Sequence, residues 1–323
     1  MTQRFDRRSF ITAAAGGAAS LAVGLNGTLN AQAPYATTLK KALIVGHPNR
    51  ENLEPVKAAG FGGVEAGIVS PDEAAAAKAV ADDLGMRIHS VLRGWAEFNS
   101  DDEAKVEASF DTSVAALKAA EGYGADAVLL VPCRIGGMAM PQPWELSIRF
   151  DANTGHLTQV IDGDNAPFAD FIKASNHSWD TSRAQIEKLI PVAEETGVVI
   201  AVENVWNNLW LEPYHFAAFV DSIGSEWVKV YFDLGNHVKY APTENWLTIL
   251  GDRIVKLHVK DFKLNDDGHG GNFVDIRDGS INWPVVRSTI DAIGYDGWAT
   301  MEGSGGLSKD EQNKRLDLIC TGR

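Results

Sequence analysis

Cysteine is scarce in this chain, which has only Cys133 and Cys320 among its 323 residues. Two cysteines so far apart cannot form a disulfide framework, although a single bond stays open to them in an oxidising compartment. Cys133 ends an apolar run, and we expect it to be a small buried side chain. Because 45% of the residues are hydrophobic and 22% charged, a large apolar core is expected to stabilise the fold instead.

Basic residues are also few relative to acidic ones. Lysine and arginine number 29 against 43 aspartates and glutamates, so the formal net charge is −14. With this charge and no Lys/Arg run, nucleic-acid binding by a basic surface is disfavoured, and we expect no nucleic-acid partner. Highly anionic ligands are disfavoured less strongly, because a local cation can override the overall charge. Long apolar runs are missing after residue 33, so we expect no membrane span once a leader is removed.

Residues 1–33 contain the three parts of an export signal in order. Arg7 and Arg8 form a twin-arginine pattern, an Ala/Gly-rich region runs to Leu25, and Ala31-Gln32-Ala33 is a small-x-small cleavage site. We interpret this segment as a twin-arginine signal peptide, and we expect a periplasmic or secreted protein. The alternative is a disordered, alanine-rich tail.

From residue 34 onward, short apolar runs alternate with amphipathic segments. The apolar runs predict strands at 42–45, 63–65, 87–91, 127–131, 198–203, 228–233, 254–259 and 298–302. The segments between and after them predict helices at 50–59, 71–84, 102–123, 181–196, 212–223, 243–250, 283–293 and 309–319. Eight strand–helix units predict a (β/α)₈ TIM barrel as a single domain over 34–323. The rival open, doubly wound sheet is expected to carry G-x-G-x-x-G after its first strand, which Val45-Gly-His-Pro-Asn49 does not match.

Two long stretches break the alternation. Residues 132–180 are rich in Gly, Pro, Asn and Trp and are expected to form a functional or mobile loop, with a small hairpin near 150–160. Thr181 is then the expected N-cap of the following helix. Residues 261–280, rich in Gly and Asp, are expected to form a second loop.

Four successive predicted strands end in Glu203, Asp233, His258 and Glu302. The carboxyl ends of parallel barrel strands meet at one face, where the active sites of such barrels lie. Three carboxylates and one imidazole suit a single divalent ion: Mn²⁺ first, with Mg²⁺, Co²⁺, Fe²⁺ or Zn²⁺ as alternatives. Each charge taken alone is also compatible with a structural salt bridge, but four on consecutive strands favour a metal site.

Motifs around these residues resemble those of a known family. They are Val202-Glu203-Asn-Val-Trp-Asn207, Tyr231-Phe-Asp233-Leu-Gly-Asn236, His258-Val-Lys260-Asp261-Phe262, and Gly294-Tyr-Asp-Gly-Trp298 before Glu302. With them the chain resembles the xylose-isomerase-like barrels, in particular the branch of L-xylulose-5-phosphate 3-epimerases and hexulose-6-phosphate isomerases. The resemblance covers essentially the whole chain after the leader. It implies that Glu203, Asp233, His258 and Glu302 bind the metal, with Glu203 and Glu302 also acting as the acid/base pair.

The resemblance and the strand positions also suggest substrate-binding residues. Glu65 and His89 are expected to end their strands at the same mouth and to bind sugar oxygens, although a core carboxylate–histidine pair is the alternative. Asn236, His237 and Lys260 follow metal ligands and are expected to contact substrate or orient those ligands. Less specific candidates are Asn204, Asn207, Arg93 and Asp261, together with Trp95, Trp206 and Trp210 as either sugar-stacking or packing residues.

These features predict a metal-dependent sugar isomerase or epimerase that removes a proton next to a carbonyl. The substrate is expected to be an unphosphorylated ketose or keto-sugar, because no Arg/Lys phosphate clamp is evident. The glutamate that D-tagatose-type 3-epimerases carry shortly after the first metal ligand is replaced by Asn207-Asn208-Leu209-Trp210. Alternatives are a lyase or dehydratase acting on a 3-keto-glycoside or keto-inositol, and a non-catalytic sugar-binding barrel. Phosphodiester hydrolysis is disfavoured by the acidic chain, and homo-oligomers are common in such barrels.

Overall fold

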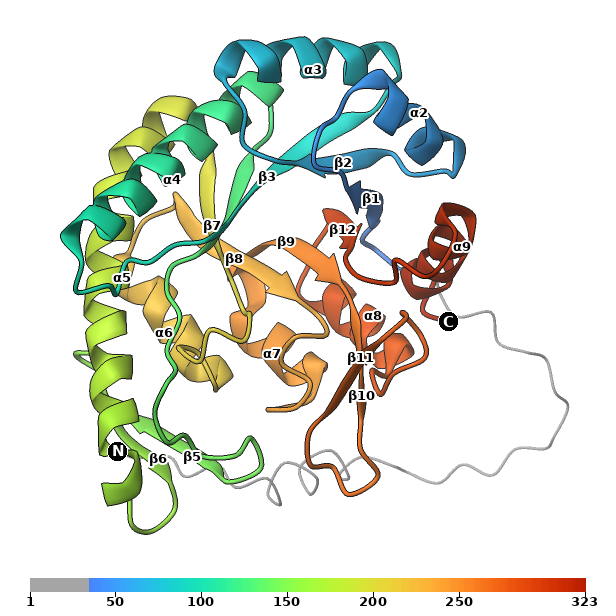
Figure 1. Cartoon of the computed structure of the whole chain (residues 1–323). Coiled ribbons are helices and arrows are strands. Elements are labelled where there is room, and N and C mark those ends of the chain that lie inside the picture. Colours follow the sequence, from blue (N-terminus) through green and yellow to red (C-terminus); the bar gives the residue numbers. More distant parts are fainter. Residues whose placement is uncertain (1–34) are drawn as a thin grey trace, which may run out of the picture. The chain divides into compact units, whose positions relative to one another are not determined.

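Eight parallel strands close into a barrel in the computed structural model, which describes residues 35–323 (Figure 1). The strand order around the barrel is β1-β12-β9-β8-β7-β4-β3-β2. The predicted (β/α)₈ TIM barrel is therefore confirmed. The expected twin-arginine leader, residues 1–33, lies outside the described residues.

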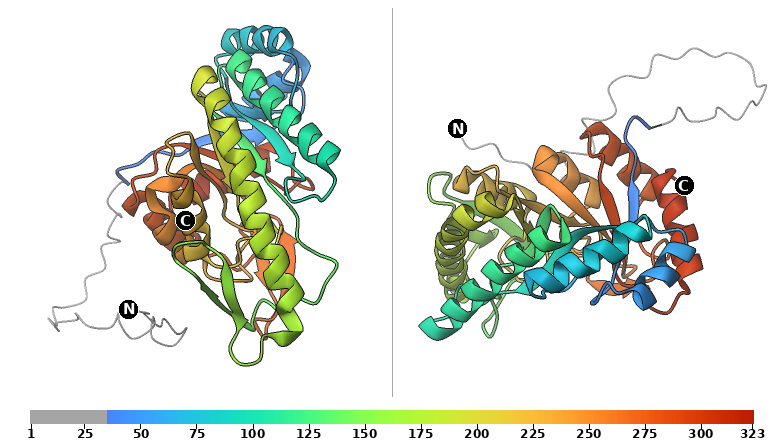
Figure 2. Two further views of the ribbon diagram at one scale, coloured as in Figure 1. Left: turned by 90° about the vertical axis from the view of Figure 1, so that its left-hand side faces the viewer. Right: turned by 90° about the horizontal axis from the view of Figure 1, so that it is seen from above.

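The barrel strands are β1 (Lys40–Ile44), β2 (Gly63–Ala66), β3 (Arg87–Trp95), β4 (Ala127–Val131), β7 (Val199–Glu203), β8 (Val228–Asp233), β9 (Ile254–Val259) and β12 (Trp298–Met301). The helices are α2 (Arg50–Ala58), α3 (Pro71–Asp83), α4 (Glu103–Tyr123), α5 (Ala169–Thr196), α6 (Pro213–Ile223), α7 (Thr243–Leu250), α8 (Trp283–Ala292) and α9 (Lys309–Cys320). They surround the barrel (Figures 1 and 2).

Local sequence explains where several helices begin and end. Helix α3 starts with a capping box, in which the Ser70 side chain accepts from the Glu73 backbone and Glu73 accepts in return, followed by Pro71. Helix α4 ends at Gly124, whose φ of 67° is a left-handed conformation that suits glycine. Glu212, predicted as the first residue of its helix, is instead the N-cap of α6.

The barrel interior has an apolar layer below a polar mouth. Ala127, Leu129, Val131, Ala201 and Tyr231 form a small buried cluster of their own. The larger apolar core lies between the strands and the helices, as alternation along each strand requires. The interior is therefore packed, and the mouth at the carboxyl ends is where polar side chains gather.

Both long stretches contain hairpins that add to the barrel (Figure 1). Strands β5 (Leu146–Phe150) and β6 (Leu157–Ile161) pair within the first, and β10 (Asp261–Leu264) and β11 (Gly271–Val274) within the second. The hairpin expected near 150–160 is thus present, whereas the second replaces an expected loop. Trp144, just before β5, stacks on His269 at the tip of the β10–β11 hairpin, with ring centroids 4.3 Å apart.

Helix α5 is longer than predicted. It begins at Ala169, so Thr181 lies inside it and is not its N-cap, and the Thr181 hydroxyl donates to the His177 carbonyl at 2.9 Å. Residues 169–180 include Ser, Asn and His, which favour helices weakly. Packing overrides this, because Phe171 and Trp179 of this added stretch are buried.

Within the described residues, no helix is long and apolar enough to cross a membrane. Both cysteines are free. Cys133 is buried, as expected, and burial raises the pKa of its thiol to about 12.

Candidate metal centre

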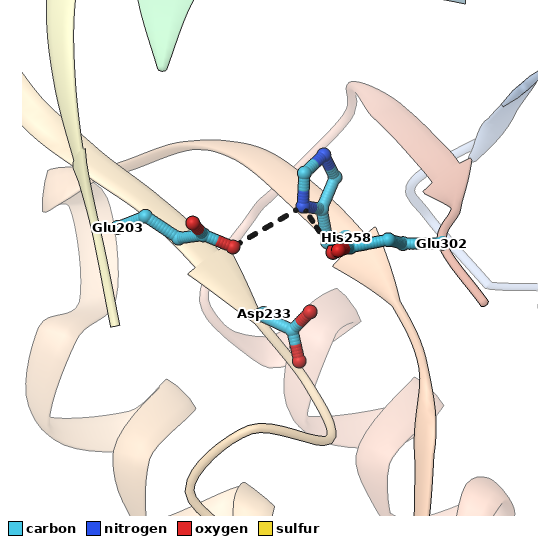
Figure 3. A group of neighbouring side chains, drawn as sticks. All are labelled: Glu203, Asp233, His258 and Glu302. Carbon is cyan, nitrogen blue, oxygen red and sulfur yellow. Dashed lines mark hydrogen bonds and ion pairs between the residues drawn. The ribbon is translucent and has the colours of Figure 1, made fainter. Parts of the chain in front are cut away.

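Four side chains meet where adjacent barrel strands end (Figure 3). Glu203 and Asp233 are the last residues of β7 and β8, His258 is next to last in β9, and Glu302 follows β12. Asp233 and His258 are direct partners in the strand register. The candidate ligand atoms of all four residues lie within 4.8 Å of one another.

The two glutamates extend towards the centre from opposite sides (Figure 3). His258 Nδ1 lies 3.3 Å from Glu203 Oε1 and 2.8 Å from Glu302 Oε2. The other ring nitrogen, Nε2, lies 2.9 Å from Glu65 Oε2. The Nδ1 atom of His258 therefore points to the centre, whereas Nε2 contacts the Glu65 carboxylate deeper in the barrel.

Asp233 is held by hydrogen bonds that leave one oxygen unused. The Asn204 side chain accepts from the Asp233 backbone N–H at 2.6 Å and donates to the Asp233 carbonyl at 2.9 Å. Asp233 Oδ1 accepts from the backbone N–H groups of Gly235 and Asn236, both at 2.7 Å. Asp233 Oδ2 is buried without a hydrogen bond to any described residue and lies 3.5 Å from Lys260 Nζ.

Negative charge is concentrated in this buried site. Burial raises the pKa of Asp233 to about 7, with Glu302 and Glu203 adding to the shift and Lys260 opposing it. Burial also works against ionisation of Glu302, but His258 and Lys260 outweigh it and lower the pKa of this carboxyl. His258 is the converse case, because the surrounding glutamates outweigh burial and raise its pKa. A further cation would relieve this repulsion.

The family model described as "Xylose isomerase-like TIM barrel" matches residues 53–317. The chain belongs to this family. An uncharacterised protein of Methanocaldococcus jannaschii is 30% identical over 130 residues, which are 38% of this chain and 43% of that protein. The match therefore spans less than half of that relative.

Similar solved structures include sugar epimerases. A xylose isomerase domain protein from Planctomyces limnophilus has a TM-score of 0.64 at 14% identity, covering 90% of this chain and 98% of that one. The E. coli 3-keto-D-glucoside 4-epimerase has a TM-score of 0.63 at 13% identity, covering 87% and 98%. A D-tagatose 3-epimerase-like protein reaches 0.65 at 18% identity, also covering 87% and 98%. At these identities the likeness shows the shared fold.

The four residues of this family member fit a divalent ion. Ligands on opposite sides of one ion are about 4.4 Å apart when each bond is about 2.2 Å, so a spread of 4.8 Å needs only small side-chain movements. Asp233 Oδ2 is a buried acceptor without a hydrogen bond to any described residue. Three carboxylates and one imidazole nitrogen are the donor set preferred by Mn²⁺ and related ions.

Glu65 and His89 lie beneath this centre, not at the mouth. Strand β3 continues to Trp95, so His89 lies inside it and does not end it as expected. Both side chains are almost fully buried, at 0% and 1% exposure. The Tyr231 hydroxyl and His258 Nε2 contact Glu65, while His89 Nε2 lies 3.0 Å from the Thr300 hydroxyl. His89 Nε2 also lies 3.6 Å from Glu65 Oε1, so their positions favour the alternative of a core carboxylate–histidine pair. Glu65 in addition orients His258.

The remaining expected substrate ligands divide into two groups. Lys260 Nζ reaches the mouth, 2.9 Å from Glu302 Oε1 and 3.3 Å from Asn236 Oδ1. Asn236 Nδ2 is buried and has no hydrogen bond to any described residue. His237, in contrast, packs on Trp246 and lies 3.1 Å from the Val205 carbonyl through Nε2. These contacts give His237 a packing role and do not support its expected contact with substrate.

The candidate aromatic residues also have different environments. Trp210 is fully buried and stacks on Phe216, so it is a core residue. Trp95 is exposed, and the Arg134 guanidinium lies over its ring. Arg93 donates a hydrogen bond through Nε to the Ser113 hydroxyl. For Asp261 and Trp206, which the sequence had named as candidates, the structure adds contacts that the sequence did not show. Asp261 fixes the loop after β11 by accepting from the backbone N–H groups of Arg277 and Gly279, and Phe273 lies beside Trp206. An isolated Phe in a Gly/Asp-rich stretch was the available signal for Phe273.

Proposed function

We propose that this protein is a metal-dependent sugar epimerase or isomerase acting on an unphosphorylated ketose or keto-sugar. The observation that carries this proposal is the convergence of Glu203 and Glu302 from opposite sides of a four-residue centre (Figure 3). Epimerisation next to a carbonyl requires proton removal from one face of a carbon and proton return on the other. Two carboxylates facing each other across the bound sugar meet that requirement.

Each side chain has a defined part in this proposal. Glu203 and Glu302 exchange the proton at the carbon beside the carbonyl, while Asp233 and His258 mainly hold the ion. A divalent ion, Mn²⁺ for preference, would supply positive charge next to the carbonyl oxygen. Lys260, close to Glu302, and Asn236, with its unpaired amide nitrogen, donate hydrogen bonds to sugar oxygens.

Solvent exchange tests the chemistry directly. The protein is incubated in D₂O with Mn²⁺ and a panel of unphosphorylated ketoses and keto-sugars, and deuterium next to the carbonyl is measured by NMR. Glu203→Gln and Glu302→Gln are each expected to slow exchange by about 10² to 10⁴-fold. The exposed Glu187→Gln on α5 is the matched control and should exchange normally. Full exchange in both active-site variants with metal bound would contradict the assignment, and an unsaturated or cleaved product would indicate a lyase.

We also propose that the protein is exported by the twin-arginine pathway. The support is the order of the twin-arginine pair, the Ala/Gly-rich region and the Ala31-Gln32-Ala33 site. Replacing Arg7 and Arg8 together by Lys should keep the protein in the cytoplasm with its leader attached, as judged by fractionation and intact mass. Replacing Arg4 by Lys is the control and should leave export unchanged. Normal export of the double variant would contradict the proposal.

A further inference from the structure

A cavity of about 780 Å³ extends outward from one side of the metal centre. Glu302 and Lys260 line its inner end, while Phe273, Lys263, Asp275 and Asp278 line the part along and beyond the β10–β11 hairpin. Glu203, Asp233 and His258 do not line it. A sugar reacting at Glu302 therefore occupies only the inner end, and the volume lies within the range of small-molecule binding pockets.

Phe273 provides the outer part of this cavity with a fixed aromatic face. Its side chain is 43% exposed, so the ring is accessible from the cavity that it lines. Trp206 lies behind it with ring centroids 4.9 Å apart, and Phe262 contacts it edge-on at 5.2 Å. Trp206 is itself held, because Lys239 Nζ lies 3.4 Å from its ring centroid. Lys260 Nζ also lies over the Phe273 ring, 5.1 Å from its centroid. The exposed part of this aromatic ring suits the apolar C–H face of a sugar ring.

The charges of the cavity favour a neutral, hydroxyl-rich group. Its ionisable lining consists of three carboxylates, Glu302, Asp275 and Asp278, against the two lysines 260 and 263. Lys260 is already engaged by Glu302 and Asp233. Arg315 Nη1 lies 2.8 Å from Asp278 Oδ2 and holds this carboxylate in place. With Arg315 counted, three cations balance the three carboxylates, and carboxylates can accept hydrogen bonds from sugar hydroxyls.

We propose that this cavity is a subsite for a second sugar unit, so that the substrate is a keto-sugar within a glycoside. This inference rests on the proposed function of the metal centre and names the substrate class for it. The reacting unit lies between Glu203 and Glu302, and the linked unit stacks on Phe273 with its hydroxyls towards Asp275 and Asp278.

The test compares a free keto-sugar with the same unit glycosidically linked to glucose. With the Mn²⁺-loaded enzyme in D₂O, kcat/KM for exchange should be at least tenfold higher for the linked form. Phe273→Ala should remove that advantage while leaving exchange into the free keto-sugar within twofold, which also shows that the centre stays intact. The exposed Tyr214→Ala on α6 is the matched aromatic control and should behave like the unaltered protein. Equal kcat/KM for both substrates would overturn the subsite and leave the proposed chemistry standing.

A binding measurement separates the two proposals. Calorimetry with the non-reacting glucosyl-glucose disaccharides and with glucose needs no turnover. Tighter binding of a disaccharide, weakened at least fivefold by Phe273→Ala, supports the subsite even if no exchange is found, in which case the proposed function fails alone. Equal binding of disaccharide and glucose, unaffected by Phe273→Ala, overturns the subsite.

Discussion

Glu65 shows how a single buried residue can act on the centre without entering it. Its carboxylate is 0% exposed and lies 2.9 Å from His258 Nε2. His258 and His89 hold it ionised against the cost of burial, and the pKa of Glu65 falls to about 2. A carboxylate on the far nitrogen of a metal-binding imidazole fixes the ring's orientation and tautomer and makes the facing nitrogen a better ligand.

Glu65→Gln is therefore expected to weaken Mn²⁺ binding by about 10- to 100-fold. Glutamine keeps an acceptor for the His258 N–H but loses the negative charge. Competition titration against a fluorescent chelator measures the affinity, and thermal unfolding of the metal-free protein checks that the barrel is intact. Glu54→Gln, an exposed change on α2, should bind Mn²⁺ normally. Unchanged affinity in Glu65→Gln would leave Glu65 as a packing residue only.

For single residues, the sequence predicts which charged side chains gather at the barrel mouth, but not how far below the mouth a given side chain lies. Glu203, Asp233, His258 and Glu302 could be named as a cluster because each closes or follows an apolar run. His89 could not be placed, because its strand runs on to Trp95 and carries the histidine below the mouth. The position of Trp210 could not be predicted either, because its spacing after Glu203 does not reveal whether it lies at the mouth or in the core, where the structure places it.

Among the elements, the two hairpins differ most from what the sequence predicts. Polar, Gly-rich segments have little periodicity, so their strands have weak signals. The β5–β6 hairpin is held by a contact that no local pattern shows: Gly155, with φ 76°, lies so close to Trp179 that an added Cβ would be 1.9 Å from its ring. The Gly155 carbonyl lies 2.8 Å from His215 Nε2 of α6. This long-range packing also explains why α5 extends back to Ala169.

His215 makes this contact sensitive to acid. It is 1% exposed and stacks on Trp179 at 4.6 Å, and burial lowers its pKa from 6.5 to about 4. Between these values the unfolded chain binds a proton that the folded protein does not, so stability falls as pH falls from about 6.5 towards 4. The loss attributable to His215 approaches about 3 kcal/mol at the lower end.

Urea unfolding of the whole protein at pH 7, 6, 5 and 4.5 measures this effect. His215→Gln keeps a donor for the Gly155 carbonyl but cannot titrate, so it should be less stable at pH 7 and lose less on acidification. His156→Gln, on a half-buried histidine that contacts Asp180, provides the control for general acid effects. Parallel pH profiles for the unaltered protein and His215→Gln would show that His215 does not titrate as argued.

For the whole molecule, the centre links four strands that are neighbours in the barrel wall, β12, β9, β8 and β7. Their order in the sequence made the closed barrel predictable, because eight alternating units leave few other topologies. The same arrangement concentrates Glu203, Asp233 and Glu302 at one end of the barrel. Their mutual repulsion opposes folding in the absence of a cation, so ion binding and barrel stability are expected to be coupled.

Mn²⁺ should therefore stabilise the entire barrel. At a free concentration 100 times the Kd, an ion that binds only the folded state adds about 2.7 kcal/mol, which corresponds to a rise in Tm of about 5 °C for a domain of this size. Scanning calorimetry after chelation and after Mn²⁺ addition measures the shift. Asp233→Asn removes a ligand charge from the centre and should abolish the Mn²⁺ response, whereas Asp317→Asn, at an exposed ion pair with Lys41, should retain it. If Asp233→Asn responded to Mn²⁺ as strongly as the unaltered protein, the ion would be bound elsewhere and the coupling between strand ends and metal would be wrong.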